Sequence, residues 1–220
     1  MEVDHIFLRV SHNAPEAELF KHIGFIEGSS NRHCGQGTAN RRFFFHNFCL
    51  ELIFIDDMDE CQNTPYTQIK LFERLTDSMA SASPFGICFR PSKDEIPDQA
   101  PFPTWNYQPQ YLPSDLTIAV APVRLNEPMW FYLSFAIPPE QTPIPHQQPL
   151  AHPCGVNRLT HINLFMPALS EQSQAAQFAQ NLPSFDICKN QTHYLELIFD
   201  QQTQKKTEDF HPTLPLIIRY

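Results

Sequence analysis

The pentapeptide LELIF occurs twice in the chain, at residues 50–54 and again at residues 195–199. Each copy lies downstream of a short apolar stretch that carries one histidine, DHIFLRV at residues 4–10 and THINLFM at residues 160–166. Parts that recur in the same order are the signature of an internal duplication. Each half of the chain is therefore expected to fold as a similar module that offers one histidine and one glutamate.

The order of the expected elements is shared as well. In the first half, local patterns predict a strand, a helix that ends at Gly24 and three further strands, at residues 3–10, 15–22, 25–28, 42–45 and 48–55. The second half repeats a strand, a helix and later strands with a shorter connection, at residues 159–166, 170–181, 193–200 and 214–220. A third correspondence, ICFR at residues 87–90 and LIIR at residues 216–219, supports the alignment. The sequence thus predicts an α+β fold of two paired β-α-β-β-β modules.

The segment between these modules is rich in proline. Residues 91–153 hold 14 of the 21 prolines, which disfavours long helices and confines strands to short pieces. Strand-like runs at residues 116–120 and 129–136, with several aromatic side chains, favour packed strands and loops over a disordered linker. We divide the chain, as one compact unit, into a first module (1–91), a proline-rich insertion with extra strands (92–153) and a second module (154–220).

Length and charge limit the classes of function. The 220 residues are 42% hydrophobic with 19 phenylalanines, enough for a sizeable core. A net charge of -9 without any basic run argues against nucleic acid or an anionic membrane as partner, and favours a small molecule. An acidic start and the absence of an apolar run of about 20 residues predict a cytoplasmic protein without a membrane span. Neither a Walker loop nor a Rossmann glycine fingerprint indicates a nucleotide cofactor.

Alternation along the strands places the repeated polar residues on one face. Ile6 and Leu8 occupy the face expected against the module's helix, and His5 occupies the other. A buried carboxylate in a strand as apolar as LELIF needs a partner, and a metal ion is one such partner. The sequence therefore predicts a site for one divalent ion (Zn, Ni, Co, Mn or Fe) with four ligands, His5, Glu51, His161 and Glu196. The alternative, that these are ordinary strand residues copied with the rest, stays open.

With these residues, the chain resembles the vicinal oxygen chelate superfamily, and within it the glyoxalase-like domain proteins that carry a His-Gly-Gly-Thr-Asn loop before a Leu-Glu-Leu strand. The corresponding loop reads EGSSNRHCGQGTANRR at residues 27–42. The resemblance extends to SPFGI (83–87), EPMWF (127–131) and HPCG (152–155), so it covers most of the chain. It implies paired modules that curl into a cup, with the same four metal ligands. The second module departs from it by lacking the long loop, and the insertion separates the modules more than in compact glyoxalases.

The part of this loop at residues 33–42 is the expected substrate site. Its glycines allow backbone N–H groups to approach a ligand, its arginines can hold a carboxylate or phosphate, and His33 can act as a general base. We assign substrate binding to Gly35, Gly37, Thr38, Asn40, Arg41 and Arg42, and catalysis to His33, Glu51 and Glu196. The alternative is a tight turn between strands, with the arginines and His33 in water.

Three functions are compatible with these expectations. The leading one is a glyoxalase-like, metal-dependent lyase or isomerase that binds vicinal oxygens of a small substrate and stabilises an enediolate while Glu51 or Glu196 moves a proton. The second is a metal-free protein that binds an anionic or aromatic small molecule between the Arg41/Arg42 loop and the tryptophan-containing insertion. A non-haem Fe(II) extradiol-type dioxygenase is less favoured. Because one chain holds both modules, a monomer or a homodimer is expected.

Overall fold

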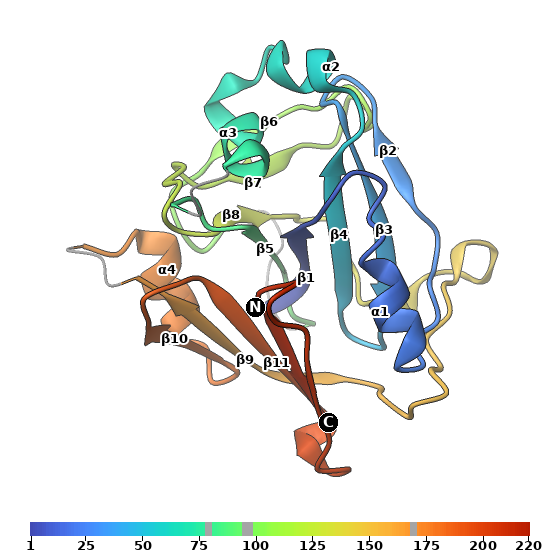
Figure 1. The fold of residues 1–220 in the computed structure, drawn as a ribbon. Helices are drawn as coiled ribbons and strands as arrows, with labels where there is room; N and C mark the ends of the chain where they lie inside the picture. Colours follow the sequence, from blue (N-terminus) through green and yellow to red (C-terminus); the bar gives the residue numbers. More distant parts are fainter. Residues whose placement is uncertain (78–80, 94–98, 168–170) are drawn as a thin grey trace.

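The computed structural model describes residues 1–77, 81–93, 99–167 and 171–220 and shows a mixed α+β protein built mostly from strands (Figure 1). An eight-stranded sheet has the order β2-β3-β4-β1-β5-β8-β7-β6, and a five-stranded sheet has the order β10-β9-β11-β13-β12. The elements of the first sheet and its connections are β1 (Glu2–Arg9), α1 (Ala17–His22), β2 (Asn31–His33), β3 (Thr38–Phe44), β4 (Cys49–Ile55), α2 (Met58–Gln62), α3 (Leu71–Thr76), β5 (Phe85–Arg90), β6 (Trp105–Tyr107), β7 (Ile118–Val120) and β8 (Met129–Tyr132). The remaining elements are β9 (Leu159–Met166), α4 (Gln174–Gln180), β10 (Phe185–Lys189), β11 (Tyr194–Phe199), β12 (Thr207–Asp209) and β13 (Leu216–Arg219).

The proline-rich segment supplies extra strands, as predicted, but these strands belong to the first sheet and do not lie between two paired modules. β1 is parallel to β4 on one side and antiparallel to β5 on the other, and β5 is in turn parallel to β8. Both edges of β1 and β5 are therefore hydrogen-bonded, which leaves no edge for a strand of the predicted second module. Residues 92–153 supply β6, β7 and β8 instead, and they complete the eight-stranded sheet. Read outward from the β1/β5 pair, the two halves of this sheet have matching orders, 1-4-3-2 and 5-8-7-6.

The two LELIF copies do not occupy equivalent places in the fold. In the first copy β4 runs parallel to β1, and Glu51 lies opposite Phe7. In the second copy β11 runs antiparallel to β9, and Glu196 lies opposite Asn163. An apolar pentapeptide specifies which side chains face the core, but it does not specify the direction of the neighbouring strand. The repeat in the sequence is therefore not a repeat in the strand pairing.

Most of the individual elements lie where the local patterns place them. Helix α1 lies within the predicted range 15–22, and β3 and β4 form the predicted antiparallel hairpin. The strand expected at residues 25–28 is reduced to one isolated bridge, between Glu27 and Phe43, and β2 takes its place as the edge strand. Helix α4 falls within the range 170–181, of which residue 170 lies outside the described residues. Strand β10 and helices α2 and α3 were not predicted.

The eight-stranded sheet has two apolar faces with different neighbours. Ile6 and Leu8 belong to the main core, which also contains side chains of the five-stranded sheet such as Ile162 and Leu197. Phe7 and Ile53 point to the opposite face, where a second cluster includes Tyr107, Met129 and Phe131. Figure 1 shows β9, β10, β11 and α4 as a layer at the lower left, apart from β2, β3 and β4. Among the described residues, the second cluster contains no side chain of the five-stranded sheet.

A buried carboxylate joins the two sheets. Glu127 is fully buried; it accepts a hydrogen bond from the indole N–H of Trp130 in β8 at 3.0 Å. It also accepts from the backbone N–H of Ser173 at 2.9 Å and from the Ser173 hydroxyl. Ser173 is the N-cap residue of α4, so one carboxylate holds both the start of β8 and the start of α4.

Candidate functional site

A cavity of about 370 Å³ lies on the second face of the eight-stranded sheet. Its walls come from both halves of the sheet, so residues of the proline-rich segment face residues of the first 55. The polar lining consists of Asp4, His5, Asn31, His33, Gln36, Arg42, Glu51 and Thr142, and the apolar lining includes Phe7, Phe44, Tyr107, Tyr111, Met129, Phe131 and Phe135. A mostly apolar pocket of this size with a few converging polar groups is typical of small-molecule sites.

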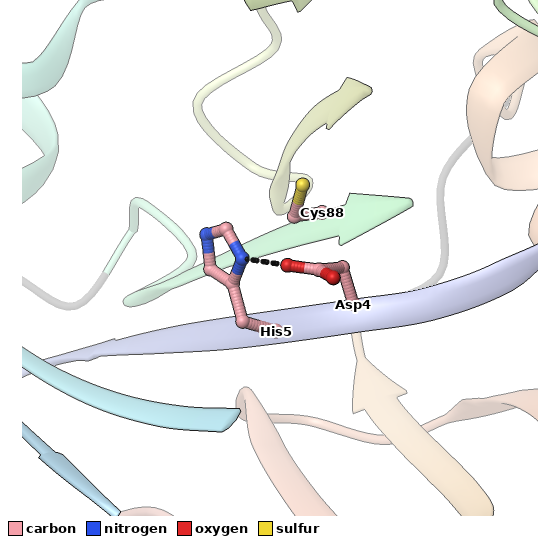
Figure 2. A group of neighbouring side chains, drawn as sticks. All are labelled: Asp4, His5 and Cys88. Atoms are coloured by element: carbon pink, nitrogen blue, oxygen red, sulfur yellow. Dashed lines mark hydrogen bonds and ion pairs between the residues drawn. The ribbon is translucent and has the colours of Figure 1, made fainter. Parts of the chain in front are cut away.

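A β-bulge brings two adjacent polar residues of β1 together. The ladder between β1 and β5 shifts register between Val3 and His5, so that Asp4 has no partner in β5. The Asp4 carboxylate lies 2.7 Å from Nδ1 of His5, and Arg90 donates to its other oxygen at 2.9 Å. Figure 2 shows His5 and Asp4 rising from β1 beside Cys88 of β5. In regular alternation the two side chains would lie on opposite faces, so this contact cannot be predicted from the pattern of residues.

The charges around His5 set its protonation. Burial by itself lowers the pKa of His5, but Cys88, the Glu51 carboxylate and the hydrogen bond to Asp4 together raise that pKa well above its usual value. Burial also raises the pKa of the Cys88 thiol, to about 11. The pKa of Asp4 is lowered, because its bonds to His5 and Arg90 outweigh the effect of burial. This wall of the cavity therefore carries a cationic imidazole at neutral pH.

His33 has the opposite tendency. Burial is the main cause that lowers its pKa, and the cations of Arg42 and His5 lower it further, against the effect of Glu51. Its Nδ1 lies 2.9 Å from the Thr38 hydroxyl, and its ring packs on Tyr111 with centroids 4.8 Å apart. The cavity thus combines one cationic and one neutral imidazole.

Two charged residues of the hairpin β3/β4 complete the polar wall. Arg42 lies directly opposite Glu51 in the ladder, and both side chains line the cavity. Arg42 donates to the backbone oxygen of Ser29 at 2.8 Å and lies over the Phe44 ring at 4.9 Å. Among the described residues, no hydrogen bond or ion pair to the Glu51 carboxylate is found. Glu51 is therefore free to contact a bound molecule.

The second copy of the repeat does not contribute to this cavity. Glu196 is held by the guanidinium of Arg219 and by the Asn163 amide, which donates at 2.6 Å. His161 lies 2.9 Å from the Asp186 carboxylate and borders a wider cleft of about 720 Å³ between the two sheets. The structure therefore brings His5 and Glu51 together but places His161 and Glu196 on the five-stranded sheet.

Most of the predicted substrate loop serves packing. Gly37 has φ +72°, and a Cβ there would lie 2.3 Å from the backbone nitrogen of Cys61 in α2. Gly35 donates its N–H to Glu60 at 2.6 Å, and Asn40 is buried, with its side-chain oxygen accepting from the N–H of Asn31. Thr38 is buried beneath the cavity wall. The glycines therefore allow the loop to approach α2.

The two neighbouring arginines lie on opposite faces of β3. Arg41 pairs with Glu27 and Glu18 and donates to the backbone oxygen of Ala14 at 3.0 Å, away from the cavity. Arg42 lines the cavity. Because successive side chains of a strand alternate, only one of two adjacent arginines can face a given ligand. Of residues 33–42, His33, Gln36 and Arg42 line the cavity, and His33 and Arg42 are the two to which the sequence assigns a role.

The four predicted metal ligands do not form one site. Within the described part of the chain, the group that could hold a metal ion consists of Asp4, His5 and Cys88, whose ligand atoms lie within 4.8 Å of one another. The Asp4 carboxylate in this group already bonds to Arg90 and His5. Since His161 and Glu196 have their own partners on the other sheet, the four-residue set does not fit a single ion.

Comparisons with known proteins give a fold and no family. No family model matches the chain, and no curated protein matches it. A solved structure described as a hypothetical protein from Staphylococcus aureus is similar with a TM-score of 0.58, covering 99% of this chain and 97% of that chain. The two sequences are 10% identical, so the likeness concerns the fold alone. Among the described residues, no helix is both long and apolar enough to cross a membrane.

Proposed function

We propose that the protein is a metal-independent, vicinal-oxygen-chelate-like protein that binds a small organic anion with a flat apolar body in the 370 Å³ cavity. The observation that carries this proposal is that one cavity joins Arg42 and His5 to an aromatic lining supplied by residues 105–135, of which Phe131 packs on His5 with ring centroids 5.3 Å apart. A cationic side and an aromatic side suit a carboxylate attached to a ring. The matching strand orders of the two halves of the eight-stranded sheet support the likeness to the superfamily's cup.

Calorimetry with 2-hydroxybenzoate and phenylacetate, with and without a chelator, tests this proposal. Arg42→Met is expected to lower the affinity about 10- to 100-fold, because a hydrogen bond to a charged group contributes about 1.5–3 kcal/mol. Arg41→Met is the matched control, since Arg41 pairs with Glu27 and Glu18 outside the cavity. The melting temperature of each unliganded variant is compared first. Equal losses in both variants, or binding abolished by the chelator, would contradict the proposal.

A glyoxalase-like metal-dependent lyase or isomerase is the second candidate. It is favoured by the closeness of Asp4, His5 and Cys88 and by the position of Glu51 on the same cavity wall. Elemental analysis of protein prepared without chelator tests it, beside His5→Ala, Cys88→Ser and the control His161→Ala. One divalent ion per chain, lost in the first two variants and kept in the control, would support this candidate. Metal-free protein after incubation with Zn, Ni, Co, Mn and Fe(II) would remove it, together with the dioxygenase alternative.

A further inference from the structure

A buried chain of hydrogen bonds ends at the cavity-lining His33. The hydroxyls of Tyr107 and Tyr111 lie 2.9 and 3.4 Å from Oε1 of Gln36. The Gln36 amide nitrogen donates to the Thr38 hydroxyl at 2.7 Å, and that hydroxyl lies 2.9 Å from Nδ1 of His33. Gln36, Thr38 and Tyr107 are all buried, so each of their protons needs an acceptor within the protein.

The tyrosines decide the orientation of the Gln36 amide. Burial raises the pKa of both Tyr107 and Tyr111, so both remain phenols that donate a proton. Only the amide oxygen can accept these protons. The reversed amide would present N–H groups to the tyrosines and leave the Tyr107 hydroxyl without an acceptor among the described residues. The amide nitrogen therefore faces Thr38.

The orientation of Gln36 in turn decides the tautomer of His33. The Thr38 oxygen accepts from Gln36, and its own proton has Nδ1 of His33 as the acceptor found in the described part of the chain. A proton on Nδ1 would point at Thr38 and would leave the Thr38 hydroxyl proton unpaired in a buried place. Nδ1 is therefore the acceptor, and the single ring proton of neutral His33 lies on Nε2.

We infer that Gln36 and Thr38 are positioning residues, which hold His33 as a neutral imidazole whose Nε2–H donates to an oxygen of the bound molecule. This inference rests on the proposed function only for the bound molecule, because the tautomer is a property of the free protein. It narrows the class of ligand to molecules that place an acceptor oxygen, such as a carboxylate or a carbonyl, against His33. His33 also lines the cavity with Tyr111 against its ring, which keeps the imidazole plane fixed.

Long-range ¹H–¹⁵N correlation NMR on protein labelled at histidine tests the tautomer. The His33 signals are assigned by their loss in His33→Gln. At pH 7.5 the wild type and Thr38→Ser, which keeps the hydroxyl, are expected to show the Nε2–H pattern. Thr38→Val cannot donate to Nδ1 and is expected to show a mixture of tautomers, and Gln36→Leu, the second variant, an intermediate pattern. An Nδ1–H or imidazolium pattern in the wild type, or an unchanged pattern in a folded Thr38→Val, would overturn the inference.

Binding of 2-hydroxybenzoate separates this inference from the proposed function. Thr38→Val is expected to weaken binding three- to tenfold, whereas Thr38→Ser stays within twofold of the wild type. If no variant binds the probe but the tautomer pattern is as expected, the proposed function fails and the positioning role stands. If the probe binds and Thr38→Val loses the Nε2–H pattern without losing affinity, His33 does not donate a hydrogen bond to the ligand and that part of the inference is wrong.

Discussion

The two copies of LELIF place the same glutamate in opposite circumstances. Glu51 lies on a cavity wall, with no hydrogen bond or ion pair to its carboxylate found among the described residues, and Glu196 is bound by Arg219 and Asn163 on a sheet face that lines no part of that cavity. The difference arises from the neighbouring strands, since β4 runs parallel to β1 and β11 antiparallel to β9. The repeated sequence therefore gives both strands the same apolar face. The partners of each glutamate carboxylate depend instead on which strands lie next to it.

The largest expected difference between the two regions concerns a pair of arginines at matching places in the repeat. Arg90 is buried and bonds to Asp4, Glu2 and the backbone oxygen of Asn47. Arg219 pairs with Glu196 but its side chain is 38% exposed. Arg90→Met is expected to lower the free energy of unfolding by about 3–5 kcal/mol, because the partly buried Asp4 carboxylate loses the guanidinium and keeps only His5 as a charged partner. Arg219→Met is expected to cost less than about 1 kcal/mol.

Urea denaturation of both variants at one pH measures this difference. The Asp4→Asn/Arg90→Met double variant is the control, because removing both charges should recover part of the loss. Similar losses from Arg90→Met and Arg219→Met would show that the two arginines are equivalent after all, and that the contrast between the two regions is incorrect.

His193, which directly precedes β11, gives an intermediate effect that depends on pH. Burial, helped by the nearby Arg74 cation, lowers the pKa of His193 to about 4. A histidine whose folded pKa is below its unfolded value of about 6.5 contributes stability above that value, and the contribution is lost as the pH falls toward 4. The free energy of unfolding of the wild type should therefore fall between pH 7 and pH 5. In His193→Gln this fall should be smaller by about 1–2 kcal/mol.

Denaturation curves at pH 7 and pH 5 check this expectation. The exposed His22 at the end of α1 provides the control His22→Gln, which should leave the pH dependence unchanged. If His193→Gln keeps the full pH dependence of the wild type, His193 accepts a proton in the folded protein and its burial has no energetic consequence.

The smallest expected effect compares the two glutamates directly. Glu51→Gln removes a negative charge near the proposed anion site and should tighten binding of 2-hydroxybenzoate about three- to tenfold, as expected for charges several ångströms apart in a partly buried site. Glu196→Gln should leave the affinity unchanged. Calorimetry on both variants decides, and weaker binding by Glu51→Gln would indicate that the carboxylate accepts a hydrogen bond from the ligand.

The sequence predicts the local pattern better than the assembly. Alternation places His5 and Glu51 on the face opposite Ile6 and Leu8, and the structure has them there. The strand-like runs predicted at residues 116–120 and 129–136 contain β7 and β8, but their place in the sheet is not predicted, because β6, β7 and β8 are only three or four residues long and lie in a segment rich in proline. Three-residue strands carry almost no periodicity, so only the surrounding ladder reveals that they extend the sheet.

Asp4 and Gln36 are not predicted as cavity residues, and the physical reason is the same for both. Asp4 reaches His5 through a bulge, and Gln36 is defined by tyrosines about 70 positions away in the chain. Neither a bulge nor a distant hydrogen bond leaves a periodic trace in the sequence. For the adjacent Arg41 and Arg42, in contrast, the sequence does contain a signal. Side chains alternate along a strand, so the two arginines cannot both contact one ligand.

The Glu127 carboxylate also limits how far the molecule can be divided. A fragment that ends before Ser173 would keep every residue that lines the 370 Å³ cavity, yet Glu127 would lose its partner at the start of α4. The core face of the eight-stranded sheet, with Ile6 and Leu8, would at the same time be opened to water. The smallest autonomous folding unit therefore extends past the last cavity residue, and the five-stranded sheet serves the binding site as its scaffold.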